Sequence, residues 1–162
     1  MTNVSFPCYQ DAEWKSAQIA RICNFMRLHD VATTAIDKRR DEIVSLRRAV
    51  LESIRISSRK RPYMADAAAF LEAIFSLTAP CHLDGARRSA VLMHSILEQA
   101  ISRLRDFSDP QAMNEVSTGA LNEAMANLFQ SCEKNIRRMT ALLENADREI
   151  CSLQDMLMKF IS

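Results

Sequence analysis

His94 is the residue whose type and surroundings in the sequence come nearest to those of a catalytic group. It lies on the apolar stripe of a predicted helix over 85–107, with Glu98 four residues after it and Arg88 six residues before it. Side chains four residues apart are neighbours on a helix, so Glu98 is within reach of the imidazole. The favoured interpretation is structural: His94 is half-buried in a helical bundle and hydrogen-bonded there.

The run Arg88-Ser-Ala-Val-Leu-Met-His94 resembles the Arg-x4–6-His signature of the HEPN superfamily, a set of small all-α domains of which many are RNases that act as dimers. This resemblance covers one helix and implies that Arg88 and His94 form a catalytic pair acting on RNA. A histidine phosphotransfer domain usually has His-x-x-Lys-Gly, whereas His94-Ser-Ile-Leu-Glu-Gln-Ala lacks that Lys and Gly. Because of the spacing of Arg88 and His94, a HEPN-like RNase or a toxin–antitoxin-type component is kept as an alternative function.

The sequence does not favour a metal or phosphate site. A di-iron bundle needs Glu-x-x-His on two helices, and none of the three histidines has a Glu three residues before it. Cys81-His82 is one close pair of zinc-type ligands and supplies only two of the four that a zinc site needs. With two glycines, the chain has no glycine-rich phosphate loop. We expect no cofactor and no catalytic activity.

The cysteines and the apolar stretches indicate the compartment. The five cysteines are odd in number and contain no C-x-x-C, which favours a reducing cytoplasm. The first ten residues have neither the basic nor the apolar region of a signal peptide. The most apolar stretch, 64–79, contains Asp66 and Glu72 and is shorter than the roughly 20 residues of a membrane span. We therefore expect a cytoplasmic protein without a membrane segment.

Charge is distributed unevenly along the chain. Residues 1–61 carry 12 Lys and Arg against 7 Asp and Glu, while residues 62–162 carry 9 against 13. The favoured interpretation is that the two halves lie against each other with complementary charges. The basic stretch 38–61 has no aromatic residue to stack on bases. A nucleic-acid-associated regulator that uses this stretch is kept as a further alternative.

The longest predicted helix covers 119–161 and has one apolar stripe. Its apolar residues recur in steps of three and four positions, as in a heptad pattern. At Cys132–Ile136 one step of four follows directly on another, which is a local stutter in that pattern. The stripe must be covered by the rest of the chain or by another copy. We expect protein-binding positions along it at Ile136, Met139, Leu143, Ile150, Leu153, Leu157 and Phe160.

The remaining pattern predicts further helices. A helix over 11–60, either unbroken or interrupted near Asp37, follows an irregular lead-in over 1–10, and a mostly apolar helix over 63–78 comes next. A connection over 79–85 follows, and Asp84 within it would cap the helix over 85–107. A short turn over 111–116 precedes the last helix. The predicted fold is all-α, a single domain over 1–162, built as an elongated antiparallel bundle of four to five helices.

No motif fixes one function. The favoured hypothesis is a non-enzymatic adaptor, chaperone or assembly protein that acts through coiled-coil contacts with a protein partner or with itself as a homo-oligomer.

Overall fold

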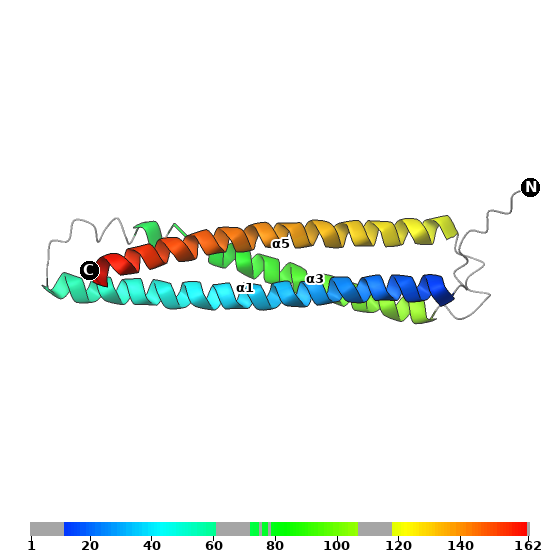
Figure 1. Ribbon diagram of the computed structural model, residues 1–162, viewed down its shortest axis with the longest axis horizontal. Helices are drawn as coiled ribbons and strands as arrows, with labels where there is room; N and C mark the ends of the chain where they lie inside the picture. Colours follow the sequence, from blue (N-terminus) through cyan, green and yellow to red (C-terminus); the bar gives the residue numbers. More distant parts are fainter. Residues whose placement is uncertain (1–11, 61–71, 75, 78, 107–117, 162) are drawn as a thin grey trace, which may run out of the picture. The chain divides into compact units, whose positions relative to one another are not determined.

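The computed structural model describes residues 12–60, 72–74, 76–77, 79–106 and 118–161. Three long helices account for nearly all of them: α1 (Ala12–Lys60), α3 (Ala79–Asp106) and α5 (Thr118–Ile161) (Figure 1). These residues contain no strand, so the all-α prediction is confirmed. The predicted helix over 63–78 is described only in its last part, where residues 72–74 are helical, and the turn over 111–116 lies outside the described residues.

Helix α1 is unbroken through the charged run that begins at Asp37. No Gly or Pro interrupts its sequence, and apolar residues continue on both sides of that run. The alternative of a break near Asp37 is therefore wrong. Positions seven residues apart along α1 are the most buried, each with at most 1% of its surface exposed: Ile22, His29, Ile36, Ile43 and Val50.

Helix α3 starts at Ala79, six residues earlier than the sequence predicts. The predicted connection over 79–85 and the cap at Asp84 are thus wrong. Pro80 is compatible with the first helical turn because the amides there have no partner inside the helix. The carboxylate of Glu149 accepts hydrogen bonds from the amide of Ala79, at 3.0 and 3.2 Å, and so supplies the cap from another helix.

The described residues group into two compact units, and each helix contributes to both. Unit 1 contains residues 12–32 of α1, 89–106 of α3 and 118–137 of α5. Unit 2 contains residues 33–60, 72–74, 76–77, 79–88 and 138–161. The prediction of one domain remains a prediction.

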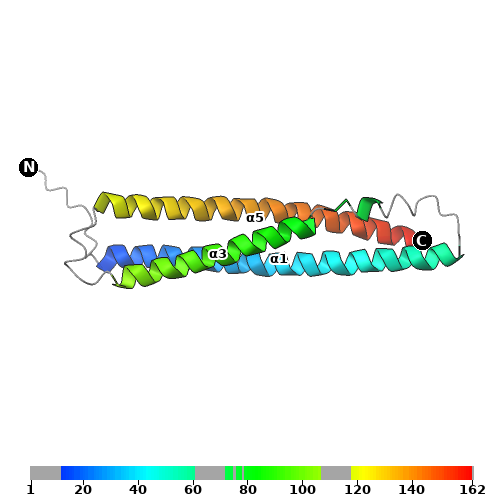
Figure 2. The same cartoon turned by 180° about the vertical axis from the view of Figure 1, so that it is seen from behind.

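Unit 1 is a three-helix arrangement around one apolar core. The blue part of α1, the yellow-green part of α3 and the yellow-to-orange part of α5 run alongside one another, with α3 antiparallel to the other two (Figures 1 and 2). The rings of Phe25 and Phe129 stack at 5.6 Å between centroids. The guanidinium of Arg21 lies 4.1 Å from the centre of the Phe129 ring and so covers the outer side of this pair. The buried core comprises Ile22, Phe25, Leu97, Leu104, Met125, Phe129 and Cys132.

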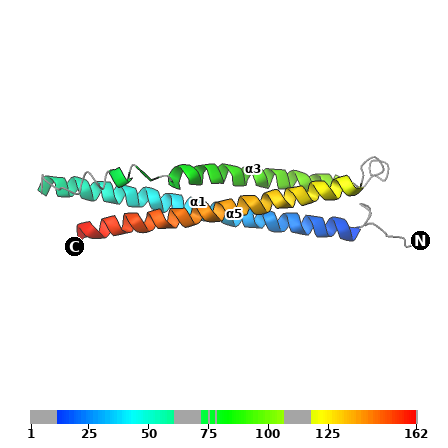
Figure 3. The ribbon, with the colours of Figure 1, turned by 90° about the horizontal axis from the view of Figure 1, so that it is seen from above.

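Unit 2 joins the second part of α1 to the start of α3 and the end of α5. Arg39 of α1 binds Asp147 of α5 at 3.1 Å. The ribbon in Figure 3 shows these two helices side by side in this unit. Arg40 binds Asp84 of α3, also at 3.1 Å. Residues with no more than 6% of their surface exposed come from all three helices and from the helical residues 72–74: Ile36, Ile43, Val50, Ile54, Ile74, Leu83, Ala86, Met139, Ala146, Ile150 and Leu153.

Candidate protein-binding surfaces

The predicted stripe of α5 faces the interior of each unit. Of the expected binding positions, Met139, Ile150 and Leu153 are buried in unit 2, where the rest of the chain covers them. Ile136 in unit 1 and Leu143 and Leu157 in unit 2 are partly exposed, and the side chain of Phe160 lies outside the described residues. The stripe therefore serves the fold of this chain at its central positions, and its role in binding another protein stays a prediction.

Sequence reasoning missed a buried polar contact in unit 1. His29 has 1% of its surface exposed and occupies an inward position of α1 that is Ile or Val at the equivalent sites in the helix. Its Nδ1 lies 2.7 Å from the carbonyl oxygen of Phe25, which can only accept, so Nδ1 carries the proton. Its Nε2 then accepts a hydrogen bond from the Asn135 amide at 3.2 Å. The seven-residue spacing from Ile22 could have revealed it.

A groove between α3 and α5 opens on the surface of unit 1. Its volume is about 340 Å³, and the lining is mostly apolar. On α3 the apolar surface continues from Ile96, which lines the groove and is 38% exposed, to Leu92 one turn earlier, which is 63% exposed. Unpaired apolar surface of this kind, lying between two helices, fits the side of an amphipathic helix. The groove is lined by Ile96, Gln99, Ala100, Arg103, Leu104, Leu121, Ala124, Met125 and Leu128.

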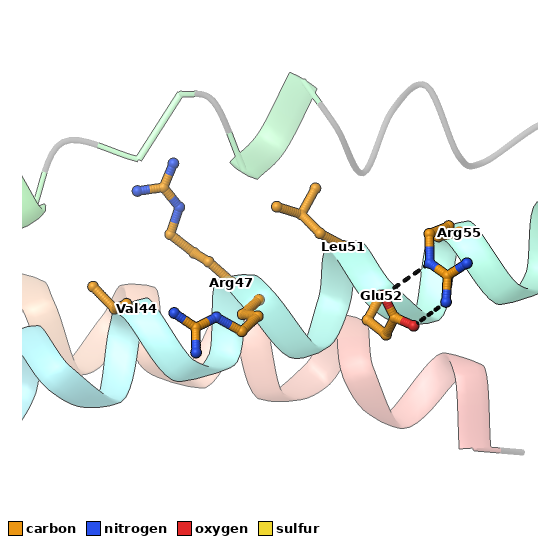
Figure 4. A pocket seen from close by; sticks show the side chains of 6 residues that line it. Val44, Arg47, Leu51, Glu52 and Arg55 are labelled. Atoms are coloured by element: carbon orange, nitrogen blue, oxygen red, sulfur yellow. Dashed lines mark hydrogen bonds and ion pairs between the residues drawn. The ribbon is translucent and has the colours of Figure 1, made fainter.

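A second surface lies on α1 in unit 2, inside the basic stretch 38–61. Leu51 lies between Arg47 and Arg55 and is 37% exposed, while Arg55 binds Glu52 (Figure 4). That hydrogen bond, with the charge of Glu52, raises the pKa of the Arg55 guanidinium. The described residues that line this surface all come from one helix, α1.

Some cationic residues of the first part of the chain form ion pairs with the second part inside each unit. That the two halves have complementary charges overall stays a prediction. Within unit 1, Arg21 and Glu133 approach to 4.0 Å. In unit 2, Arg39 and Arg40 of the basic stretch bind Asp147 and Asp84. Arg47 and Arg48 have no ion pair with the described residues. A role of the basic stretch in binding nucleic acid stays a prediction.

His94 lies between two carboxylates in unit 1 and has 28% of its side chain exposed. Its Nε2 is 3.4 Å from Asp30 of α1, and its Nδ1 is 3.6 Å from Glu98 of its own helix. The expected partner, Glu98, is thus present, and Asp30 is one that the sequence did not reveal. Arg88 belongs to unit 2 and is exposed. The catalytic pair that the HEPN resemblance implies stays a prediction.

The cysteines of the described residues are all reduced thiols. Cys23, Cys81 and Cys151 are exposed, whereas Cys132 is buried. Burial, with a smaller contribution from the charge of Glu133, raises the pKa of the Cys132 thiol to about 11. The described residues form no cluster of three or more potential metal ligands. None of the described helices is long and apolar enough to cross a bilayer.

Comparison of the chain with protein-family models, with curated proteins and with solved structures gives no match.

Proposed function

We propose that this protein is a non-enzymatic assembly or adaptor protein that binds a helix in the α3–α5 groove of unit 1. The observation that carries the proposal is the groove itself, with the exposed side chains of Leu92 and Ile96 on its α3 side. Burying a large aliphatic side chain stabilises a complex by about 1.5–3 kcal/mol when the side chain passes fully out of water. Two such side chains beside a preformed groove therefore favour a docked helix.

Two features make this groove a better candidate than the other surfaces. It has two walls of different helices, whereas the surface around Leu51 has described lining residues from α1 alone. Of the residues that line it, Arg103 is the one that carries a charge, and interface centres are depleted of charge. The α5 stripe, by comparison, has its central residues Met139 and Leu153 already buried.

Site-specific photo-cross-linking tests the proposal. A photoreactive amino acid at Ile96 in the full-length protein, in the cell that makes it, should give adducts with a protein, which mass spectrometry identifies together with the linked peptide. The control places the same amino acid at Ser102, an exposed position on a different side of α3. The proposal would be supported if cross-linking from position 96 gave adducts and if the additional change Leu92→Asp abolished them. Equal adducts at both positions, or none at 96, would overturn it.

A further inference from the structure

The α3–α5 groove is apolar at one end and carries a positive charge at the other. The start of α5 lies beside the end of α3, so the two helices run antiparallel along the groove (Figure 1). Ile96 and Leu128 therefore line one end, and Arg103 and Leu121 line the other. Leu92, one turn before Ile96 and 63% exposed, extends the apolar end. A helix that enters the groove thus meets two chemically different ends.

Arg103 is available to an incoming group. It is the one charged side chain among the described residues that line the groove, and it is exposed. It forms no ion pair with the described part of the chain. Glu98, an acid of the same helix, lies 3.6 Å from His94 and lines a different surface together with Arg105. The positive charge in the groove is therefore not neutralised by a described carboxylate.

We propose that the occupant of the groove is an amphipathic helix of another protein, and that its apolar stripe carries an Asp or Glu where it meets Arg103. This inference rests on the proposed function and names the chemistry of its partner. A guanidinium and a carboxylate form charge-assisted hydrogen bonds, which are shorter and stronger than neutral ones. The carboxylate of the partner supplies the acceptor that the described lining of the groove lacks.

The charge of the partner follows from what docking does to Arg103. A helix that lies over the groove removes water from around the guanidinium, and a charge that loses water without gaining a partner weakens the complex. A carboxylate at this place offsets that loss, whereas a Lys or Arg adds repulsion between like charges. The apolar end with Leu92 and Ile96 supplies most of the affinity, and the charged end selects among apolar helices.

The spacing of the two ends fixes where the acid lies in the partner. Ile96 and Arg103 are seven residues apart on α3, which is two helical turns or about 10.5 Å. On the partner helix the acid therefore lies about two turns from the apolar side chain that contacts Ile96. It comes after that side chain if the partner runs parallel to α3, and before it if the partner runs antiparallel.

Selection from a displayed peptide library against the full-length protein tests this. The peptides are helical, about 18 residues or roughly 27 Å long, with a fixed apolar stripe and all other positions randomised. Peptides that use the groove are those that bind the unchanged protein and fail to bind the double variant Leu92→Gln with Ile96→Gln, which adds no charge. These peptides should share an Asp or Glu at one place, about two turns from an apolar residue.

A charge exchange then shows whether Arg103 recognises that acid. Fluorescence anisotropy compares one selected peptide with the same peptide carrying Lys in place of the acid. On the unchanged protein the Lys peptide should bind about fivefold more weakly or worse, and on Arg103→Glu the order of the two peptides should reverse. The matched control is Arg105→Glu, at an exposed residue of α3 outside the described lining, which should still prefer the acidic peptide. Circular dichroism confirms that each variant is folded.

The outcomes separate this inference from the proposed function. Selected peptides with the shared acid, and a preference that Arg103→Glu reverses, would support both. If the selected peptides need Leu92 and Ile96 but show no preference for an acid, or keep that preference in Arg103→Glu, the acidic partner is wrong and the groove still binds a helix. If no selected peptide depends on Leu92 and Ile96, and position 96 gives no adduct, both are wrong.

Discussion

The imidazole of His29 and the side-chain amide of Asn135 meet inside unit 1, with 3.2 Å between Nε2 and Nδ2. His29 occupies a position in the seven-residue repeat that is Ile at 22, 36 and 43. A polar residue at one such position of a helical bundle fixes the register at a cost in stability, because it is satisfied in one alignment of the helices only. This contact therefore sets how α5 is aligned along α1 in unit 1.

Removing the side-chain amide of Asn135 alone should lower the free energy of unfolding more than removing both this amide and the imidazole of His29. Asn135→Ala leaves the buried Nε2 of His29 without this donor and should lower the free energy of unfolding by about 1–3 kcal/mol. The double change His29→Ile with Asn135→Ala removes the need for a donor and should regain most of that loss. A urea-denaturation double-mutant cycle measures the coupling. Additive effects of the two changes would contradict a direct contact.

The cap on α3 should contribute measurable stability to unit 2. Glu149→Ala removes both hydrogen bonds to the Ala79 amide and the negative charge at a helix N-terminus, and should lower the free energy of unfolding by about 1–2 kcal/mol. Chemical denaturation followed by circular dichroism measures this. Glu144→Ala, at an exposed position of the same helix, is the control and should change it by less than about 0.5 kcal/mol. Equal losses of unfolding free energy in Glu149→Ala and Glu144→Ala would contradict the capping role of Glu149.

The stripe of α5 should behave as the core of this chain. Leu153 is fully buried, so Leu153→Ala should lower the free energy of unfolding by about 2–5 kcal/mol. Met158→Ala changes a side chain that is 62% exposed and should have an effect below about 1 kcal/mol. Thermal unfolding of the two variants separates these outcomes. If Leu153→Ala changed only the native mass and not the unfolding, the stripe would be an interface between chains.

The cysteines should differ in reactivity. At pH 8 the exposed Cys23 and Cys151 should react rapidly with a maleimide, whereas Cys132 should be protected because it is buried and thiolate is the reactive form. Mass spectrometry of peptides from a labelling time course measures each site. Labelling of the urea-unfolded protein is the control, in which all sites should react. Rapid labelling of Cys132 in the folded protein would contradict its burial.

The raised pKa of the Cys132 thiol predicts that the stability of the protein depends on pH. Its pKa rises from 9.0 to about 11 on folding, so the folded state binds this proton more tightly than the unfolded state. The resulting stabilisation is complete below pH 9 and is lost as the pH rises from 9 to about 11. The measurement is the free energy of unfolding between pH 9 and pH 11. Its decrease over this interval should be smaller in Cys132→Ala than in the unchanged protein, because the variant has no thiol at this position.

Local patterns predicted much of the fold. The all-α class, the long last helix and its apolar stripe follow from helical periodicity, and Ile36, Ile43 and Val50 are buried as their seven-residue spacing indicates. The start of α3 could not be predicted because its cap is Glu149, a residue seventy positions away, while Asp84 looked like a local cap and instead binds Arg40.

The candidate site was harder to predict than the fold. Periodicity identifies which residues are apolar on one side of a helix, but it does not identify what covers them. The stripe through Met139 and Leu153 looked like a binding surface and is buried within the chain. Leu92 and Ile96 gave no signal as an interface, because their exposure depends on where α5 lies beside α3 in unit 1.

The stacking of Phe25 on Phe129 has a consequence for biosynthesis. The second ring is translated about one hundred residues after the first, and α5 supplies one wall of each unit. At about 5–20 residues per second, the inward face of α1 waits roughly 5–20 s on the ribosome before its partner helix is made. Neither core can close before α5 has been made, so until then the inward-facing isoleucines of α1 lack the helix that covers them in the folded protein.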